Sequence, residues 1–77
     1  MASPINERIA KRVRGILAER RISDKAYYLG VGMAERTGAR RLAGTSSWTT
    51  DELVATARFL DVRVSELMRD VELEQVA

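Results

Sequence analysis

The sequence predicts an all-α fold, a compact bundle of about five short helices that forms a single domain over residues 1–77. Apolar residues recur at spacings of three and four along most of the chain, which is the period of a helix with one buried face. Capping residues and glycines divide this pattern into short segments, and the sole proline, Pro4, precedes the first of them. A chain of 77 residues has room for one domain.

The first helix is predicted from five apolar residues whose spacing places them on one face, which we expect to be buried: Ile5, Ile9, Val13, Ile16 and Leu17. Three arginines lie between them, Arg8, Arg12 and Arg14, and are expected to face water or a partner. The outer surface of this helix should therefore be basic.

Ser23 and two glycines mark the limits of the second and third helices. Ser23 suits an N-cap, because its hydroxyl can accept a hydrogen bond from a backbone N–H of the first turn. We expect the second helix to run to about Val31 and to end at Gly32. The third should cover residues 34–42 and stop at Gly44, since glycine favours the left-handed conformation at a helix C-terminus.

The fourth helix has the clearest start signal in the chain. Thr49 with Glu52 three residues later forms a capping box, and Trp48 and Leu53 are spaced for a hydrophobic staple across it. This helix should end near Asp61, a residue type that tolerates left-handed backbone.

A short fifth helix is expected from a cap at Ser65 to about Asp70, which limits the core to residues 5–70. Residues 71–77 alternate apolar and acidic side chains. This tail can extend the helix, form a strand or stay loose, and it is a candidate dimer contact.

The composition excludes several classes of function. The chain has no cysteine and no histidine, so disulfides, thiolate chemistry, zinc fingers and Ser-His triads are all ruled out. We therefore expect no enzyme, no catalytic residues, no metal, no cofactor and no small-molecule ligand. Charged residues appear by position 7 and no long apolar run occurs, so no signal peptide or membrane span is expected and the cytoplasm is the predicted location.

Charge is distributed unevenly along the chain. Residues 1–44 hold ten bases and four acids, a net charge of +6, whereas residues 45–77 hold three bases and seven acids, a net charge of −4. A basic N-terminal part favours a polyanionic partner, although an ordinary solvated surface gives the same count.

From Ser23 to Gly44 the chain resembles the phage repressor/Cro-like (Xre-type) helix-turn-helix family. Val31-Gly32-Met33-Ala34 takes the place of the family's Leu-Gly-Val-Ser turn, and Thr37-Gly38-Ala39-Arg40-Arg41-Leu42-Ala43-Gly44 matches its Thr-Val-Ser-Arg-Arg-Leu-x-Gly stretch without a gap. The later segments Trp48–Leu53, Leu60-Asp61-Val62 and Ser65-Glu66-Leu67 resemble the family's fourth and fifth helices. The resemblance covers roughly residues 9–69 and implies a lambda-repressor-like bundle.

Two residues depart from the family pattern. Tyr28 stands where the family has a small alanine in its second helix, and Gly38 stands where it has valine or isoleucine in its recognition helix. Because these two positions face each other in the family, the exchange conserves volume, which cores tolerate best. In the alternative interpretation, the Tyr28 hydroxyl reaches a phosphate.

The resemblance also implies which residues contact DNA, because the third helix of such a domain enters the major groove by its N-terminal part. The predicted base contacts are Ala34, Glu35, Arg36 and Arg40. Arg36 suits guanine, Ala34 suits a thymine methyl group, and Glu35 either accepts from cytosine or orients an arginine. The predicted contacts to the DNA backbone are Ser23, Lys25, Thr37, Arg41, Ser46, Ser47 and Thr49, with pairing to an acid of its own fold as the alternative for Arg41.

The function expected from this resemblance is a sequence-specific double-stranded-DNA-binding transcriptional regulator. A small phage-type Cro or repressor protein of this kind would bind a pseudo-palindromic operator as a homodimer, in the cytoplasm or nucleoid of a bacterial host. Two alternatives stay open. One is a helical protein-interaction module, such as an antirepressor or an antitoxin-like adaptor, and the other is a basic first helix that lies on an anionic membrane surface.

Overall fold

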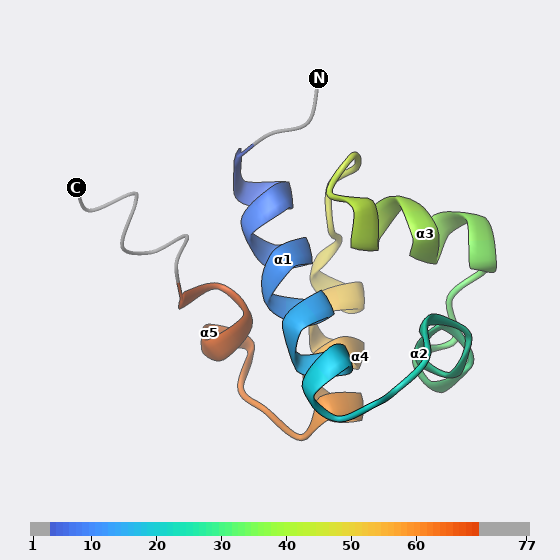
Figure 1. Ribbon diagram of the computed structural model, residues 1–77. Coiled ribbons are helices and arrows are strands. Elements are labelled where there is room, and N and C mark those ends of the chain that lie inside the picture. The colour runs from blue at the N-terminus through green and yellow to red at the C-terminus, as the bar shows by residue number, and fades with distance from the viewer. Residues whose placement is uncertain (1–3, 70–77) are drawn as a thin grey trace.

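The computed structural model describes residues 4–69, and this part of the chain contains five helices and no strand (Figure 1). The helices are α1 (Pro4–Glu19), α2 (Asp24–Val31), α3 (Glu35–Ala43), α4 (Thr50–Leu60) and α5 (Val64–Leu67). α1 packs against α3 and α5, while α2 packs against α3 and α4. The prediction of an all-α fold is thereby confirmed, and the predicted limits of α2, α3 and α4 agree with the structure to within one or two residues.

Two of the three predicted N-caps, Ser23 and Thr49, are confirmed. The hydroxyl of Ser23 accepts a hydrogen bond from the backbone N–H of Ala26, 3.1 Å away. At α4 both halves of the capping box form, because the Thr49 hydroxyl accepts from the Glu52 N–H (3.1 Å) and the Glu52 carboxylate accepts from the Thr49 N–H (2.9 Å). These bonds satisfy backbone donors that have no partner within their own helix.

Four helices end in the same way. In each, one residue adopts left-handed backbone, and the residue after it donates its N–H to a carbonyl five residues earlier, which is the Schellman arrangement. The left-handed residues are Arg21, Gly32, Gly44 and Asp61. Three of the residues that follow them are apolar and pack on the core: Ile22, Met33 and Val62. The connections between helices are therefore short and fixed by local hydrogen bonds.

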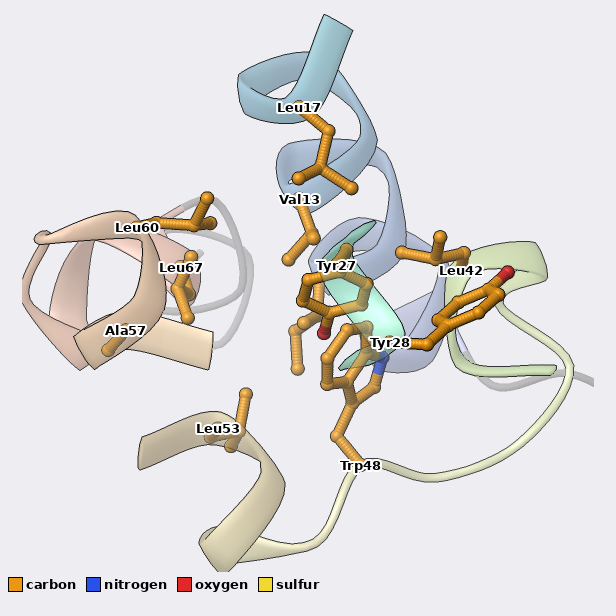
Figure 2. Close-up of a cluster of buried hydrophobic side chains, with 11 residues drawn as sticks. Val13, Leu17, Tyr27, Tyr28, Leu42, Trp48, Leu53, Ala57, Leu60 and Leu67 are labelled. Atoms are coloured by element: carbon orange, nitrogen blue, oxygen red, sulfur yellow. The ribbon is translucent and has the colours of Figure 1, made fainter. Parts of the chain in front are cut away.

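The core lies between α1, α2 and α4 and is centred on Tyr27, which is fully buried (Figure 2). Its ring lies among apolar side chains from every helix, and its hydroxyl forms a 2.7 Å hydrogen bond with Thr56, which is also fully buried. Burial raises the pKa of Tyr27 to about 12, although the bond from Thr56 acts in the opposite direction. The hydroxyls of Tyr27 and Thr56 thus satisfy each other inside an apolar interior.

Two arginines, Arg14 in α1 and Arg20 directly after its last residue, bond to the C-terminal ends of other helices. The guanidinium of Arg14 donates to the carbonyl of Leu42 in α3, and that of Arg20 donates to the carbonyl of Leu60 in α4. The last carbonyls of a helix lack internal partners and carry partial negative charge, so a cation suits both places. Arg14 was expected to face water or a partner, and it is exposed, but its guanidinium also forms this bond within the fold.

Two expectations are wrong. Ile5 is 40% exposed, because the buried face of α1 is centred on Asn6, Ala10 and Val13. Ser65 does not cap α5. That helix begins at Val64 with Arg63 in the N-cap position and no side-chain cap bond. It ends at Leu67, and the expected extension to residue 70 lies outside the described residues, as does the tail 71–77.

Among residues 4–69 no helix is both long enough and apolar enough to cross a membrane.

Candidate nucleic-acid interface

The outer face of α3 presents two arginines one helical turn apart. Arg36 and Arg40 are both exposed and are separated by four residues, so their side chains follow each other along one face. Ala39 and Ala43 are exposed beside them. Because alanine is short, this face allows a close approach to the helix backbone between the two guanidinium groups.

The start of α3 lies at the same surface. Ala34 occupies the N-cap position without a side-chain cap bond, and Glu35 is the first helical residue. All four residues predicted to contact bases, namely Ala34, Glu35, Arg36 and Arg40, are exposed. Ala39 and Ala43 were missed by the sequence analysis, although their spacing from Arg36 and Arg40 places them on this face.

The inner face of α3 is fixed by an unusually close contact with α2. Gly38 and Tyr28 are both buried, and a Cβ atom at residue 38 would overlap the Cδ1 and Cε1 atoms of the Tyr28 ring and lie 3.0 Å from its Cγ. The Tyr28 side chain extends from α2 toward α3 beside Leu42 (Figure 2). The predicted exchange of volume between positions 28 and 38 is thereby confirmed, and Tyr28 is a packing residue.

The three-residue connection between α2 and α3 is defined by local bonds. Gly32 has φ +73°, a conformation that favours glycine, and Met33 donates its N–H to the carbonyl of Tyr28 at 2.9 Å. Met33 is half-buried against the core. The connection is short, and these bonds together with the packing of Met33 define how α2 leads into α3.

At the N-terminus of α2, Ser23 and Lys25 are exposed, and the Ser23 oxygen accepts the cap bond described above. At the start of α4, Ser47 and Thr49 are exposed, while Ser46 is half-buried, as is Thr37 on the side of α3. In Figure 1, α3 lies between α2 and the loop that leads to α4. The predicted backbone contacts therefore lie on both sides of the arginine face.

The hydroxyls of the loop share one feature, which is that each oxygen accepts a hydrogen bond from another group of the protein. Ser46 accepts from the guanidinium of Arg41, Ser47 accepts from the amide of Asn6 at 3.5 Å, and Thr49 accepts from the Glu52 N–H. A hydroxyl that accepts in this way keeps its own hydrogen available as a donor. The loop can therefore offer several donors to an anion.

Arg41 is held inside the fold by Glu52, as the alternative interpretation expected. Its Nε lies 2.6 Å from Glu52 Oε1 and its Nη2 lies 3.1 Å from Glu52 Oε2, so the pair is bidentate. Burial acts to raise the pKa of Glu52, but the bonds from Arg41 and Thr49 outweigh it and the pKa is lowered. Glu52 is thus ionised at neutral pH.

Within the described part of the chain, no group of three or more Asp and Glu residues is arranged to hold a metal ion. Comparison with protein-family models, with curated proteins and with solved structures finds no match to this chain.

Proposed function

We propose that the chain is a sequence-specific double-stranded-DNA-binding transcriptional regulator of the phage Cro/repressor type, in which α2 and α3 form a helix-turn-helix. The observation that carries the proposal is the outer face of α3, where Arg36 and Arg40 are exposed one turn apart while Gly38 is packed against Tyr28. A helix held by its inner face and bearing arginines on its outer face suits the major groove.

The first turn of α3 supplies the chemistry of base recognition. Arg36 can form a bidentate contact with O6 and N7 of guanine, and Ala34 can contact a thymine methyl group. Glu35 accepts from the N4 amino group of cytosine or orients Arg36. Arg40, one turn further along, reaches a base or a phosphate at the edge of the groove.

Contacts to the DNA backbone come from the two flanking elements. Ser23 and Lys25 lie at the start of α2, and Ser47 and Thr49 lie at the start of α4. Helix N-termini favour anions, because their first N–H groups and their dipole both point to the end of the helix. Such contacts fix the orientation on the duplex and carry no sequence information.

The regulator binds as a homodimer, since one such helix reads only a short half-site. The two halves of a pseudo-palindromic operator would then lie about 34 Å apart, one turn of the duplex. Residues 64–77 hold four acids and one base, a net charge of −3, which disfavours close contact with DNA, so α5 and the segment after it are the proposed dimer side. Bound to its operator in a bacterial host, the dimer blocks polymerase.

A second candidate function is a helical protein-interaction module without DNA recognition. It is favoured by Leu29, whose side chain is 76% exposed on the outer face of α2. A leucine this exposed suits a protein partner, although single exposed apolar residues are common on protein surfaces.

Selection of bound duplexes from a random pool distinguishes the two functions. A regulator should enrich a pseudo-palindromic sequence, and its affinity for that sequence should fall steeply with salt. An adaptor should enrich no sequence at any salt concentration. If repeated rounds of selection yield no common sequence, the proposed function is wrong.

A further inference from the structure

The ion pair between Arg41 and Glu52 joins the two sides of the candidate interface. Arg41 lies in the last turn of α3 and Glu52 in the first turn of α4, and only 15% and 17% of their side chains are exposed. The same guanidinium also donates to the hydroxyl of Ser46 in the loop between these helices. One side chain thus contacts both the loop and the helix that follows it.

The pairing changes what Arg41 can do electrostatically. Both Glu52 oxygens accept from Arg41, and the lowered pKa of Glu52 keeps the carboxylate charged at neutral pH. The positive charge of Arg41 is therefore largely cancelled where it sits. Arg36 and Arg40, in contrast, are exposed on the outer face of α3.

The bond to Ser46 determines where the serine hydrogen can point. Since the Ser46 oxygen accepts from the guanidinium, the hydroxyl hydrogen is turned away from that positive charge. Ser46 is half-buried, so part of the residue is accessible from solvent, where its hydroxyl can donate to a ligand. A donor held in this orientation suits a phosphate oxygen.

We infer that Arg41 and Glu52 are a positioning pair, which orients the Ser46 hydroxyl as a donor to a DNA phosphate and holds the loop in register with α3. The inference rests on the proposed function. Arg41 itself makes no phosphate contact in this arrangement, which differs from the role that the family resemblance implied for it.

Glu52→Gln tests whether Arg41 positions Ser46 or binds a phosphate itself, because the two roles predict changes of opposite sign in the affinity for DNA. Glutamine can still accept from the Thr49 N–H and preserve the capping box, but it removes the charge that holds Arg41. If the pair positions Ser46, affinity for all duplexes falls about tenfold, the size of one hydrogen bond to a charged acceptor, although the net charge rises by one. If Glu52 merely restrains a phosphate-binding arginine, affinity rises and the salt dependence becomes steeper. That result would overturn the inference.

A double-mutant cycle tests the link to Ser46. Ser46→Ala should weaken binding about tenfold in the wild-type protein and less than about twofold in the Glu52→Gln protein, because the hydroxyl is no longer oriented there. Ser47→Ala is the matched control. Its hydroxyl is held by Asn6, so its loss should cost the same factor in both backgrounds. Equal losses for Ser46→Ala in both backgrounds, or no loss in the wild-type protein, would overturn the inference.

The same measurements separate this inference from the proposed function. Circular dichroism must show that each variant has the helicity of the wild-type protein, so that unfolding is not mistaken for lost binding. A wild-type chain that binds no duplex refutes the proposed function. A wild-type chain that binds DNA, with Glu52→Gln binding more tightly, refutes only the positioning role of Arg41 and Glu52.

Discussion

The contact between Tyr28 and Gly38 sets the position of α3, and a change of one methyl group tests it. Gly38→Ala alone adds helix propensity of about 1 kcal/mol. The new Cβ, however, overlaps two atoms of the Tyr28 ring, and that ring belongs to a buried residue with 8% exposure. Overpacking of this kind costs about 1–3 kcal/mol even after relaxation, so the gain in helix propensity is offset or exceeded and we expect a net loss of up to about 2 kcal/mol in the free energy of unfolding.

When the Tyr28 ring is removed, the effect of Gly38→Ala on the free energy of unfolding should change sign. Tyr28→Ala leaves a cavity and costs about 3–5 kcal/mol. In that background the Cβ at residue 38 meets no ring, so Gly38→Ala should stabilise by about 1 kcal/mol through helix propensity alone. The coupling energy between the two positions is then about 1–3 kcal/mol.

Urea unfolding, followed by circular dichroism, measures the free energy of unfolding of the wild-type protein, the two single variants and the double variant. Sucrose is added to all samples, because it stabilises folded proteins and keeps the least stable variant folded at the start of the titration. Gly15→Ala is the matched control, since a Cβ at residue 15 on α1 would meet nothing within 4 Å. It should stabilise by about 0.5–1 kcal/mol. If Gly38→Ala stabilises the wild-type protein as much as Gly15→Ala does, the packing of α3 described here is wrong.

Three further outcomes follow from the structure. Gly30→Ala should destabilise the protein less than Gly38→Ala, because the new Cβ would overlap the ring of Phe59, which is only half-buried and can move aside. The melting temperatures of the two variants test this order. The raised pKa of Tyr27, about 12 against an ordinary 10, means that the folded chain holds this proton more tightly than the unfolded chain, so stability is complete below pH 10 and falls as the pH rises toward 12. After allowance for solvent screening the loss is about 1–2 kcal/mol, and urea unfolding should show a smaller loss in Tyr27→Phe. The pKa of Glu52 is lowered by folding, so the pH dependence has the opposite sign: the stability that this carboxylate contributes above its ordinary pKa of 4.5 is lost on acidification. Acid unfolding of Glu52→Gln should therefore lack this loss of stability.

Local signals in the sequence predicted most helix limits correctly. Ser23, Thr49 and the left-handed positions at Gly32, Gly44 and Asp61 act through bonds to residues at most five positions away, so a short window contains all the information needed. The family resemblance added one long-range contact, because it placed position 28 opposite position 38.

Other contacts depend on how helices meet in space and left no such signal. The bond of Arg14 to the Leu42 carbonyl spans 28 residues, and nothing in the spacing of the arginines of α1 distinguishes Arg14 from its neighbours. Ile5 fits the apolar spacing of α1 but is 40% exposed, whereas Asn6 beside it is buried and donates to Ser47 in the loop after α3. For Arg41 the sequence left a phosphate or an internal acid open, and the structure places it on Glu52.

Base recognition by α3 is tested by comparing two exposed cations, Arg36 on its outer face and Lys25 at the start of α2. The measurement is the affinity of each alanine variant for the selected operator, its single-base variants and unrelated duplexes, over a series of salt concentrations. Arg36→Ala should lose about 1–3 kcal/mol on the operator and lose discrimination at one base pair of each half-site. Lys25→Ala should weaken every duplex equally and reduce the salt slope by about one. If Arg36→Ala lowers all affinities by the same factor and leaves base preference unchanged, α3 does not read the operator through Arg36.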